Sequence, residues 1–240
     1  MIKVKNLTKK FKDFEAVINI SFEAKEGEVL GLLGENGAGK TTILRMLATM
    51  LKPTDGTVEI NGYNLIKDSD RIRGEIGILF GGEIGIYDRL TARENIKYFA
   101  ELNNMGKKDI NNRINELSRM LDMDDYINKR VGKFSRGMKQ KVSIARAIVH
   151  NPKVMLLDEP TTGLDVTSTR IVHDFIDSCR NQGKVIIFSS HTMSEVEKLC
   201  DRVIIIHKGR IAAQGTIPDL KKYFNNDNLE EVFMELVGGK

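Results

Sequence analysis

One glycine-rich octapeptide limits the folds open to this chain more than any other feature. It reads Gly34-Glu35-Asn36-Gly37-Ala38-Gly39-Lys40-Thr41 and satisfies the pattern G-x-x-x-x-G-K-[ST]. An apolar run at residues 29–33 stands directly before it, and a helical pattern over residues 41–51 follows. A strand, then this loop, then a helix is the arrangement in which the pattern binds phosphate. The alternative interpretation is a flexible turn that matches the pattern by accident.

The residue types of this loop explain how it holds a phosphate group. Glycines allow consecutive backbone N–H groups to point at one cluster of phosphate oxygens, and the positive end of the following helix faces the same place. Lys40 is predicted to reach the β- and γ-phosphates, and the Thr41 hydroxyl is predicted to bind Mg²⁺. The predicted nucleotide-binding residues are Gly34, Asn36, Gly37, Ala38, Gly39, Lys40, Thr41 and Thr42.

A second apolar run, Val154-Met155-Leu156-Leu157, ends in two acids, Asp158 and Glu159. Ligands bind at the carboxyl ends of parallel strands, so Asp158 is predicted to hold Mg²⁺ through water. Successive side chains of an extended segment point in opposite directions, so Glu159 is predicted to face the γ-phosphate and polarise the attacking water. Such a pair can also lie on a solvated sheet edge. The glycine-rich loop favours the nucleotide interpretation.

Short apolar runs at residues 29–33, 154–157, 185–188 and 203–206 predict strands that are covered on both faces, as in a mostly parallel sheet. Helical patterns over residues 166–179 and 194–199 separate the later runs, so the predicted class is α/β.

The N-terminal part predicts a different, antiparallel sheet. Apolar and polar residues alternate there, and turn signals flank a short strand. The apolar positions on which this prediction rests are Ile2, Val4, Ile18, Ile20, Phe22 and the strand at residues 58–60.

Residues 90–151 contain helix signals and no strand-like run. Thr91 and Glu94 form a capping box, Asp109 is predicted to cap a second helix, and Ser135 is predicted to open a third that runs to about Val149. This segment therefore predicts a helical subdomain inserted into the α/β core.

Composition excludes several classes of protein. The 240 residues are 41% hydrophobic and 29% charged, a globular balance rather than a disordered or fibrous one. The longest unbroken apolar stretches have four residues, whereas a membrane span needs about 20, and the N-terminus lacks an apolar signal segment, so we expect a cytoplasmic chain. The net charge of +4 is dispersed along the chain and does not indicate whether an anionic partner would be a nucleotide, a nucleic acid or a lipid. Cys179 and Cys200 are predicted to be buried free thiols.

Several ordered segments resemble the ATP-binding cassette (ABC) ATPases. Residues 134–141, Phe-Ser-Arg-Gly-Met-Lys-Gln-Lys, are similar to the signature motif of that family, and residues 158–165, Asp-Glu-Pro-Thr-Thr-Gly-Leu-Asp, to its Walker B motif and D-loop. Ser189-Ser190-His191 is similar to the switch-histidine loop. Phe11 stands where the family places an aromatic ring against adenine, although Phe14 is close by and Phe11 can instead be a core residue.

The resemblance covers residues 1–220 and leaves residues 221–240 as a short C-terminal tail. It implies a P-loop NTPase (RecA-like) core, with ATP and Mg²⁺ as cofactors and Lys40, Glu159 and His191 as catalytic residues. His150, His173 and His207 are interpreted as surface or packing residues.

The resemblance also implies partners. In this family the signature of one copy closes over the ATP of a second copy, which gives Ser135, Gly137 and Met138 a role in trans. A plain helix cap is the alternative for Ser135. A separate transmembrane permease is the other implied partner, so that the chain lies on the inner face of the membrane, and no nucleic acid is expected.

Two departures from the family pattern stand out. Arg136 replaces the first glycine of the signature, and Gly81-Gly82 stands where a Q-loop glutamine is expected. Glu83, two positions on, can approach the metal or the permease, or be a solvated acid.

Residues 81–95 look close to the sodium-extrusion ABC ATPases of the NatA type, which implies Na⁺ efflux. Export of drugs, peptides or lipids remains open, and so do a non-transport ABC ATPase and a nucleotide sensor. The single cassette without a coiled-coil insertion disfavours the non-transport class, and Glu159 with His191 disfavours the sensor.

Overall fold

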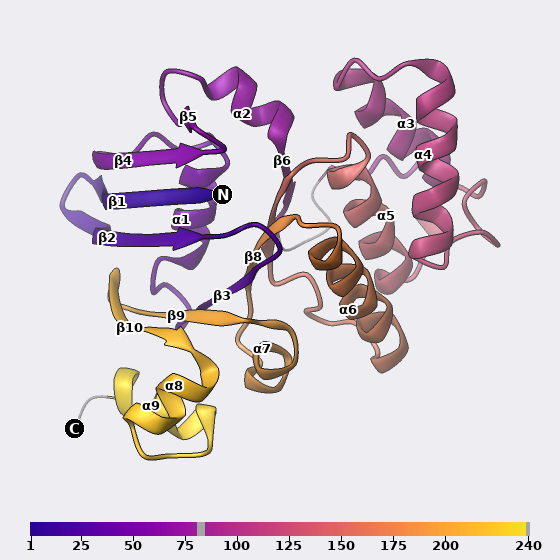
Figure 1. Ribbon diagram of the computed structural model, residues 1–240. Coiled ribbons are helices and arrows are strands. Elements are labelled where there is room, and N and C mark those ends of the chain that lie inside the picture. Colours follow the sequence, from indigo (N-terminus) through magenta and orange to yellow (C-terminus); the bar gives the residue numbers. More distant parts are fainter. Residues whose placement is uncertain (81–84, 239–240) are drawn as a thin grey trace.

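Residues 1–80 and 85–238, which the computed structural model describes, form two β-sheets with helices packed on them (Figure 1). The first sheet is antiparallel and has the order β2-β1-β4-β5. Its strands are β1 (Ile2–Phe11), β2 (Phe14–Ala24), β4 (Asp55–Ile60) and β5 (Tyr63–Asn64). The predicted N-terminal antiparallel sheet is confirmed.

The second sheet has the order β10-β9-β3-β8-β7-β6. All neighbouring pairs are parallel except β9 and β10, which are antiparallel. This confirms the predicted α/β class with a mostly parallel sheet. The strands are β3 (Val29–Leu33), β6 (Ile76–Leu79), β7 (Val154–Asp158), β8 (Val185–Ser189), β9 (Arg202–His207) and β10 (Arg210–Thr216).

The helices cover both faces of this second sheet. Helix α1 begins directly at Lys40 and ends at Leu47, four residues earlier than predicted, because Thr49 has a left-handed backbone with φ of 59°. The remaining helices are α2 (Ser69–Glu75), α3 (Ala92–Leu102), α4 (Lys107–Met120), the 3₁₀ turn η1 (Val131–Lys133), α5 (Arg136–Ile148), α6 (Val166–Asn181), α7 (Met193–Leu199), α8 (Ile217–Tyr223) and α9 (Leu229–Val237).

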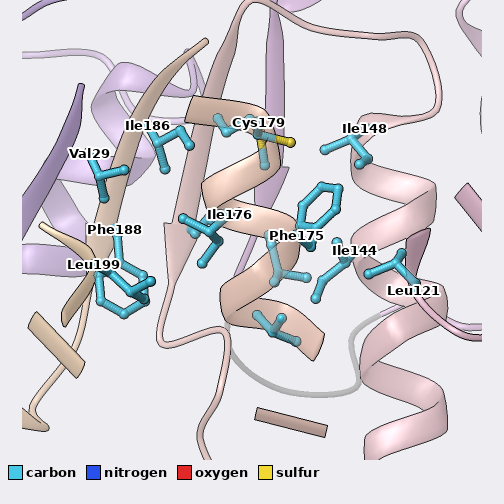
Figure 2. Packing of buried hydrophobic residues seen from close by; sticks show 14 of the residues in the cluster. Val29, Leu121, Ile144, Ile148, Phe175, Ile176, Cys179, Ile186, Phe188 and Leu199 are labelled. Atoms are coloured by element: carbon cyan, nitrogen blue, oxygen red, sulfur yellow. The ribbon is translucent and has the colours of Figure 1, made fainter. Parts of the chain in front are cut away.

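Alternate residues of each central strand face different cores, because side chains alternate along a strand. In β8, Ile187 packs in the core that α1 shares with the first sheet, and Ile186 and Phe188 pack in the core under α5 and α6. Figure 2 shows Phe175 of α6 between those strand residues and Ile144 of α5. The two cores hold the P-loop helix on one face of the sheet and the helical segment on the other.

The segment from residue 90 to 151 contains α3, η1, α4 and α5 and no strand. Thr91 and Glu94 form the predicted capping box, and the Ser135 hydroxyl caps α5 by accepting from the Met138 N–H. The prediction for Asp109 was wrong. Gly106 is the N-cap of α4, and Asp109 lies in its first turn, where a carboxylate still interacts favourably with the helix dipole.

The C-terminal helices pack on the sheet. Leu229, Val232 and Val237 of α9 are buried, and α9 contacts α7, α8 and both strands β9 and β10. Cys179 and Cys200 are buried free thiols, as predicted. No helix among the described residues is long and apolar enough to cross a membrane.

His150, two residues beyond the end of α5, is expected to make stability depend on pH. Its Nε2 donates to the Ile76 carbonyl at 3.0 Å, while Nδ1 is buried without a partner among the described residues. Burial, with Lys184 and Arg113 adding to it, lowers the pKa of His150 below 6.5. The unfolded chain therefore takes up a proton at acidic pH that the folded chain resists, so stability falls as the pH drops below about 6.5.

We expect His150→Gln to reduce the fall in the free energy of unfolding at acidic pH. For one proton, this fall is at most about 1.4 kcal/mol per pH unit. Urea unfolding at a series of pH values from about 7.5 to 5.5 measures it. His207→Gln is the control, because His207 is part-exposed beside Glu35. The same pH dependence in parent and His150→Gln would contradict the assignment.

Candidate nucleotide site

The glycine-rich loop connects β3 to α1 and is pressed against neighbouring strands. A Cβ on Gly34 would lie 2.4 Å from the Ile206 carbonyl oxygen, and one on Gly39, with φ of 116°, would lie 2.6 Å from the Ala16 carbonyl oxygen. No side chain fits at either position. The loop therefore keeps its shape only with glycines there.

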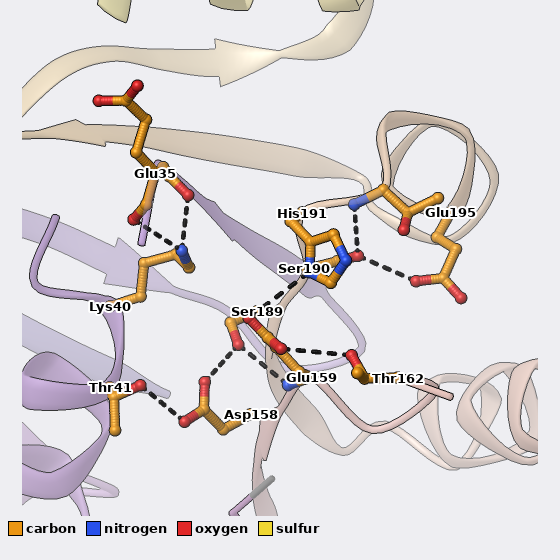
Figure 3. Close-up of polar contacts among 12 residues, drawn as sticks. Glu35, Lys40, Thr41, Asp158, Glu159, Thr162, Ser189, Ser190, His191 and Glu195 are labelled. Atoms are coloured by element: carbon orange, nitrogen blue, oxygen red, sulfur yellow. Dashed lines mark hydrogen bonds and ion pairs between the residues drawn. The ribbon is translucent and has the colours of Figure 1, made fainter. Parts of the chain in front are cut away.

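Lys40 closes this loop from the helix side. Its ammonium donates to the carbonyl oxygens of Gly34 at 2.6 Å and Glu35 at 3.1 Å, as Figure 3 shows. Burial lowers the pKa of Lys40 below its usual range, while the carboxylates of Glu159 and Asp158 oppose that shift. A positive charge thus lies in the cradle, in a partly desolvated place where an anionic phosphate stabilises it.

Asp158, at the end of β7, joins the P-loop helix to β8. One carboxylate oxygen accepts from the Thr41 hydroxyl at 2.8 Å, and the other accepts from the Ser189 hydroxyl at 2.5 Å. Mg²⁺ prefers oxygen ligands and is usually bound by one or two protein groups together with phosphates and water. The hydroxyl and carboxylate that meet here are such a donor set, so the residues fit Mg²⁺.

Glu159 differs from the prediction in one respect. It was expected to continue an extended strand, but its φ is 49°, in the left-handed region. Its backbone N–H donates to Ser189, to the carbonyl oxygen and the hydroxyl, both at 3.1 Å, and these bonds hold the turn. The turn, rather than strand alternation, directs the Glu159 side chain away from Asp158. That carboxylate accepts from the Thr162 hydroxyl at 3.2 Å and lies 3.5 Å from Nδ1 of His191.

Of these residues, Lys40, Thr41 and Glu159 line one cavity of about 270 Å³. Phe11 and Phe14 lie at its edge with exposed fractions of 44% and 62%, so neither is a core residue, and both are available to an adenine ring. The lining residues are Phe11, Phe14, Ala16, Glu35, Asn36, Gly37, Gly39, Lys40, Thr41, Thr42 and Glu159.

The signature residues lie elsewhere. Ser135, Gly137 and Met138 stand at the start of α5 and do not line this cavity. The side chain of Arg136 lies over Gly163, so close that a Cβ on that glycine would be 2.3 Å from the guanidinium. Arg136 therefore contacts the loop that follows Glu159 in its own chain.

Other predicted or overlooked residues can now be placed. Gly81-Gly82 and Glu83 lie outside the described residues. Ser189 was quoted as part of the switch-histidine loop but given no role, although it bonds both Asp158 and Glu159. The signal that could have identified it is a hydroxyl at the end of an apolar strand, two residues before His191.

The match to a family model identifies the kind of protein. Residues 17–162 match the model described as ABC transporter. The chain belongs to the ABC transporter family. It is an ABC transporter ATP-binding subunit, with the α/β cassette described above.

Two relatives illustrate the range of this family. The ABC transporter ATP-binding protein NatA of Bacillus subtilis is 46% identical over 100% of this chain and 99% of its own length. The bacitracin transport ATP-binding protein BcrA of Bacillus licheniformis is 41% identical over 92% of this chain and 72% of its own length.

Solved ABC structures have the same fold. The ATP-binding subunit of an ABC transporter superposes with a TM-score of 0.90 at 28% identity, covering 98% of this chain and 99% of that one. A dimeric ATP-binding cassette in a post-hydrolysis state, bound to ADP and Pi, has a TM-score of 0.81 at 27% identity and covers 90% of this chain and 99% of that one.

Proposed function

We propose that this ABC subunit is a Mg²⁺-dependent ATPase that powers an exporter, and that the exported ion is Na⁺. The observation that carries the ATPase part is the meeting of Thr41 and Asp158 at 2.8 Å, beside Lys40 and Glu159. Two segments distant in sequence, Lys40-Thr41 and Asp158-Glu159, supply a phosphate-binding cation, oxygen ligands and a carboxylate base at one place.

Each side chain of the site has its own role in hydrolysis. Lys40 binds the β- and γ-phosphates, and Glu159 accepts a proton from the attacking water. His191, at 3.5 Å from Glu159, donates to the γ-phosphate. Thr41 and Asp158 hold Mg²⁺, which when bound neutralises charge that develops on the phosphate oxygens. Phosphate release from purified protein given ATP, with and without Mg²⁺, tests this assignment, and equal release in both would refute the metal dependence.

A second copy of the chain completes each site. Ser135, Gly137 and Met138 lie at the start of α5 and do not line the cavity of their own P-loop, and Ser135 is exposed, which supports their binding the ATP of the other copy. The dimeric ADP-bound relative described above supports the same arrangement.

A transmembrane permease is the partner that couples hydrolysis to transport. Exposed apolar side chains on and just before α3 support a contact surface there, with Tyr87 45%, Tyr98 41% and Leu102 60% exposed. A cavity of about 450 Å³, lined by residues that include Met50 and Phe80, opens beside the segment at residues 78–80. This surface would place the chain on the cytoplasmic face of the membrane.

Sodium is proposed as the substrate from the likeness of residues 81–95 to sodium-extrusion ABC ATPases, and the 46% identity to NatA supports it. Deletion of the gene is expected to lower tolerance of external Na⁺ and raise cytoplasmic Na⁺, measured with a sodium-sensitive dye. Complementation with Lys40→Ala should fail, whereas the parent gene should restore tolerance.

Drug or peptide export is the second candidate, because BcrA, a bacitracin transport protein, is 41% identical. Unchanged Na⁺ handling in the deletion strain, together with new sensitivity to bacitracin, would favour this candidate and reject sodium.

A further inference from the structure

Glu195, in the first turn of α7, has a largely buried side chain that the mechanism above does not use. Its side chain is 11% exposed. One carboxylate oxygen lies 3.2 Å from Nε2 of His173 on α6. The other accepts from the Ser190 hydroxyl at 2.9 Å, as Figure 3 shows. Ser190 directly precedes His191, so this carboxylate contacts the loop that carries the histidine.

The neighbours of Glu195 keep its carboxyl ionised. Burial alone would raise the pKa of Glu195, but His173, Ser190 and the buried Thr161, two residues beyond Glu159, outweigh it and lower that pKa. Glu195 is therefore an ionised carboxylate that joins side chains from separate segments.

The hydrogen bonds around Ser190 fix the backbone at His191. The Ser190 hydroxyl donates to Glu195 and accepts from the Thr192 N–H at 2.9 Å, so His191 lies in a turn closed by that hydroxyl. The His191 ring is 57% exposed, and its contact with Glu159 is 3.5 Å. Without the Glu195 carboxylate, the Ser190 hydroxyl would lose its acceptor, and the turn would lose its side-chain link to His173 of α6.

We infer that Glu195 is a positioning residue for ATP hydrolysis, which through the Ser190 hydroxyl holds the loop of His191 in place. His173 orients the Glu195 carboxylate from α6. A carboxylate that only stabilised α7 would contribute to the free energy of unfolding and leave the chemical step unchanged. Loss of a positioning carboxylate therefore lowers kcat, whereas loss of a purely stabilising one does not.

The first experiment, which rests on the ATPase function proposed above, compares ATP turnover of the full chain. Glu195→Ala is expected to lower kcat by about tenfold with KM for ATP within about twofold, because the loop that moves is not the phosphate cradle. Glu195→Gln keeps an acceptor oxygen and is expected to retain intermediate activity. Glu197→Gln is the control, since that carboxylate lies on the same helix and pairs with Lys221 at 2.6 Å.

The second experiment is a double-mutant cycle with His191→Ala, followed by single-turnover hydrolysis so that slow rates are measurable. If Glu195 acts through His191, adding Glu195→Ala to His191→Ala should lower the rate by less than about twofold. A tenfold loss in both backgrounds would overturn the inference.

A further variant covers the case in which Glu195→Ala fails to fold. Ser190→Ala removes only the hydroxyl between Glu195 and the loop, and the same kcat loss is expected. A parent chain without ATP turnover would refute the proposed function itself. An active parent whose Ser190→Ala and Glu195→Gln variants both match it would refute only the role of Glu195.

Discussion

Lys40→Ala is expected to abolish ATP turnover. Lys40 is the one P-loop cation, its ammonium donates to the Gly34 and Glu35 carbonyl oxygens, and it is the group proposed to bind the β- and γ-phosphates. Removal of a fixed donor in an active site lowers kcat by about 10²–10³, and here a full charge is lost as well. Phosphate release under saturating Mg-ATP measures the effect.

The control must separate lost chemistry from lost folding. Lys12→Ala makes the same change of charge on an exposed turn between β1 and β2 and is expected to keep parental turnover. Thermal unfolding of Lys40→Ala should show a folded chain, because the removed hydrogen bonds are worth only about 1 kcal/mol each. Turnover of folded Lys40→Ala within twofold of the parent would contradict the P-loop assignment.

Glu159→Gln is expected to separate ATP binding from ATP hydrolysis. The amide oxygen can still accept from Thr162, so the loop keeps its shape, but glutamine cannot take a proton from water. We expect turnover to fall by a factor on the order of 10² or more while ATP affinity stays within a few-fold. An ATP-bound dimer should accumulate, visible as a Mg-ATP-dependent shift in size-exclusion chromatography.

Glu35→Gln is the matched control for Glu159. Its carboxylate is 59% exposed and pairs with His207 at 3.8 Å, so a charge is lost near the cavity without removing the base. Parental turnover is expected for this variant. A monomeric and fully active Glu159→Gln variant would contradict both the base assignment and the ATP-sandwich dimer.

The sequence predicted both the alternating strands of the first sheet and the apolar strands of the second. β7, β8 and β9 were predicted closely, because each has four consecutive apolar residues that are all buried. β6 was missed. Its run is broken by Gly77, where a Cβ would lie 2.7 Å from the Ala147 carbonyl oxygen, so α5 packs against bare backbone. Because the strand residue at this contact is a glycine, the sequence shows no apolar side chain there.

The residues of the site also divide into those that local motifs predict and those that only the fold brings together. Lys40, Thr41 and Asp158 could be assigned from local motifs, because each role depends on a loop and a strand end. Glu195 could not be, since its environment comes from α6 and from loops after two different strands. The strand order decides which side chains from distant parts of the sequence meet. Local sequence patterns do not specify that order.

The order of strands in the second sheet has a consequence for synthesis on the ribosome. β3 (Val29–Leu33) leads into the P-loop, but its partners β8 and β9 do not begin until Val185 and Arg202. An apolar strand with unpaired edges is prone to associate with other chains, and pairing across such long separations is slow. The nascent chain therefore exposes Val29–Leu33 during most of its translation, and this segment is where a chaperone would protect it.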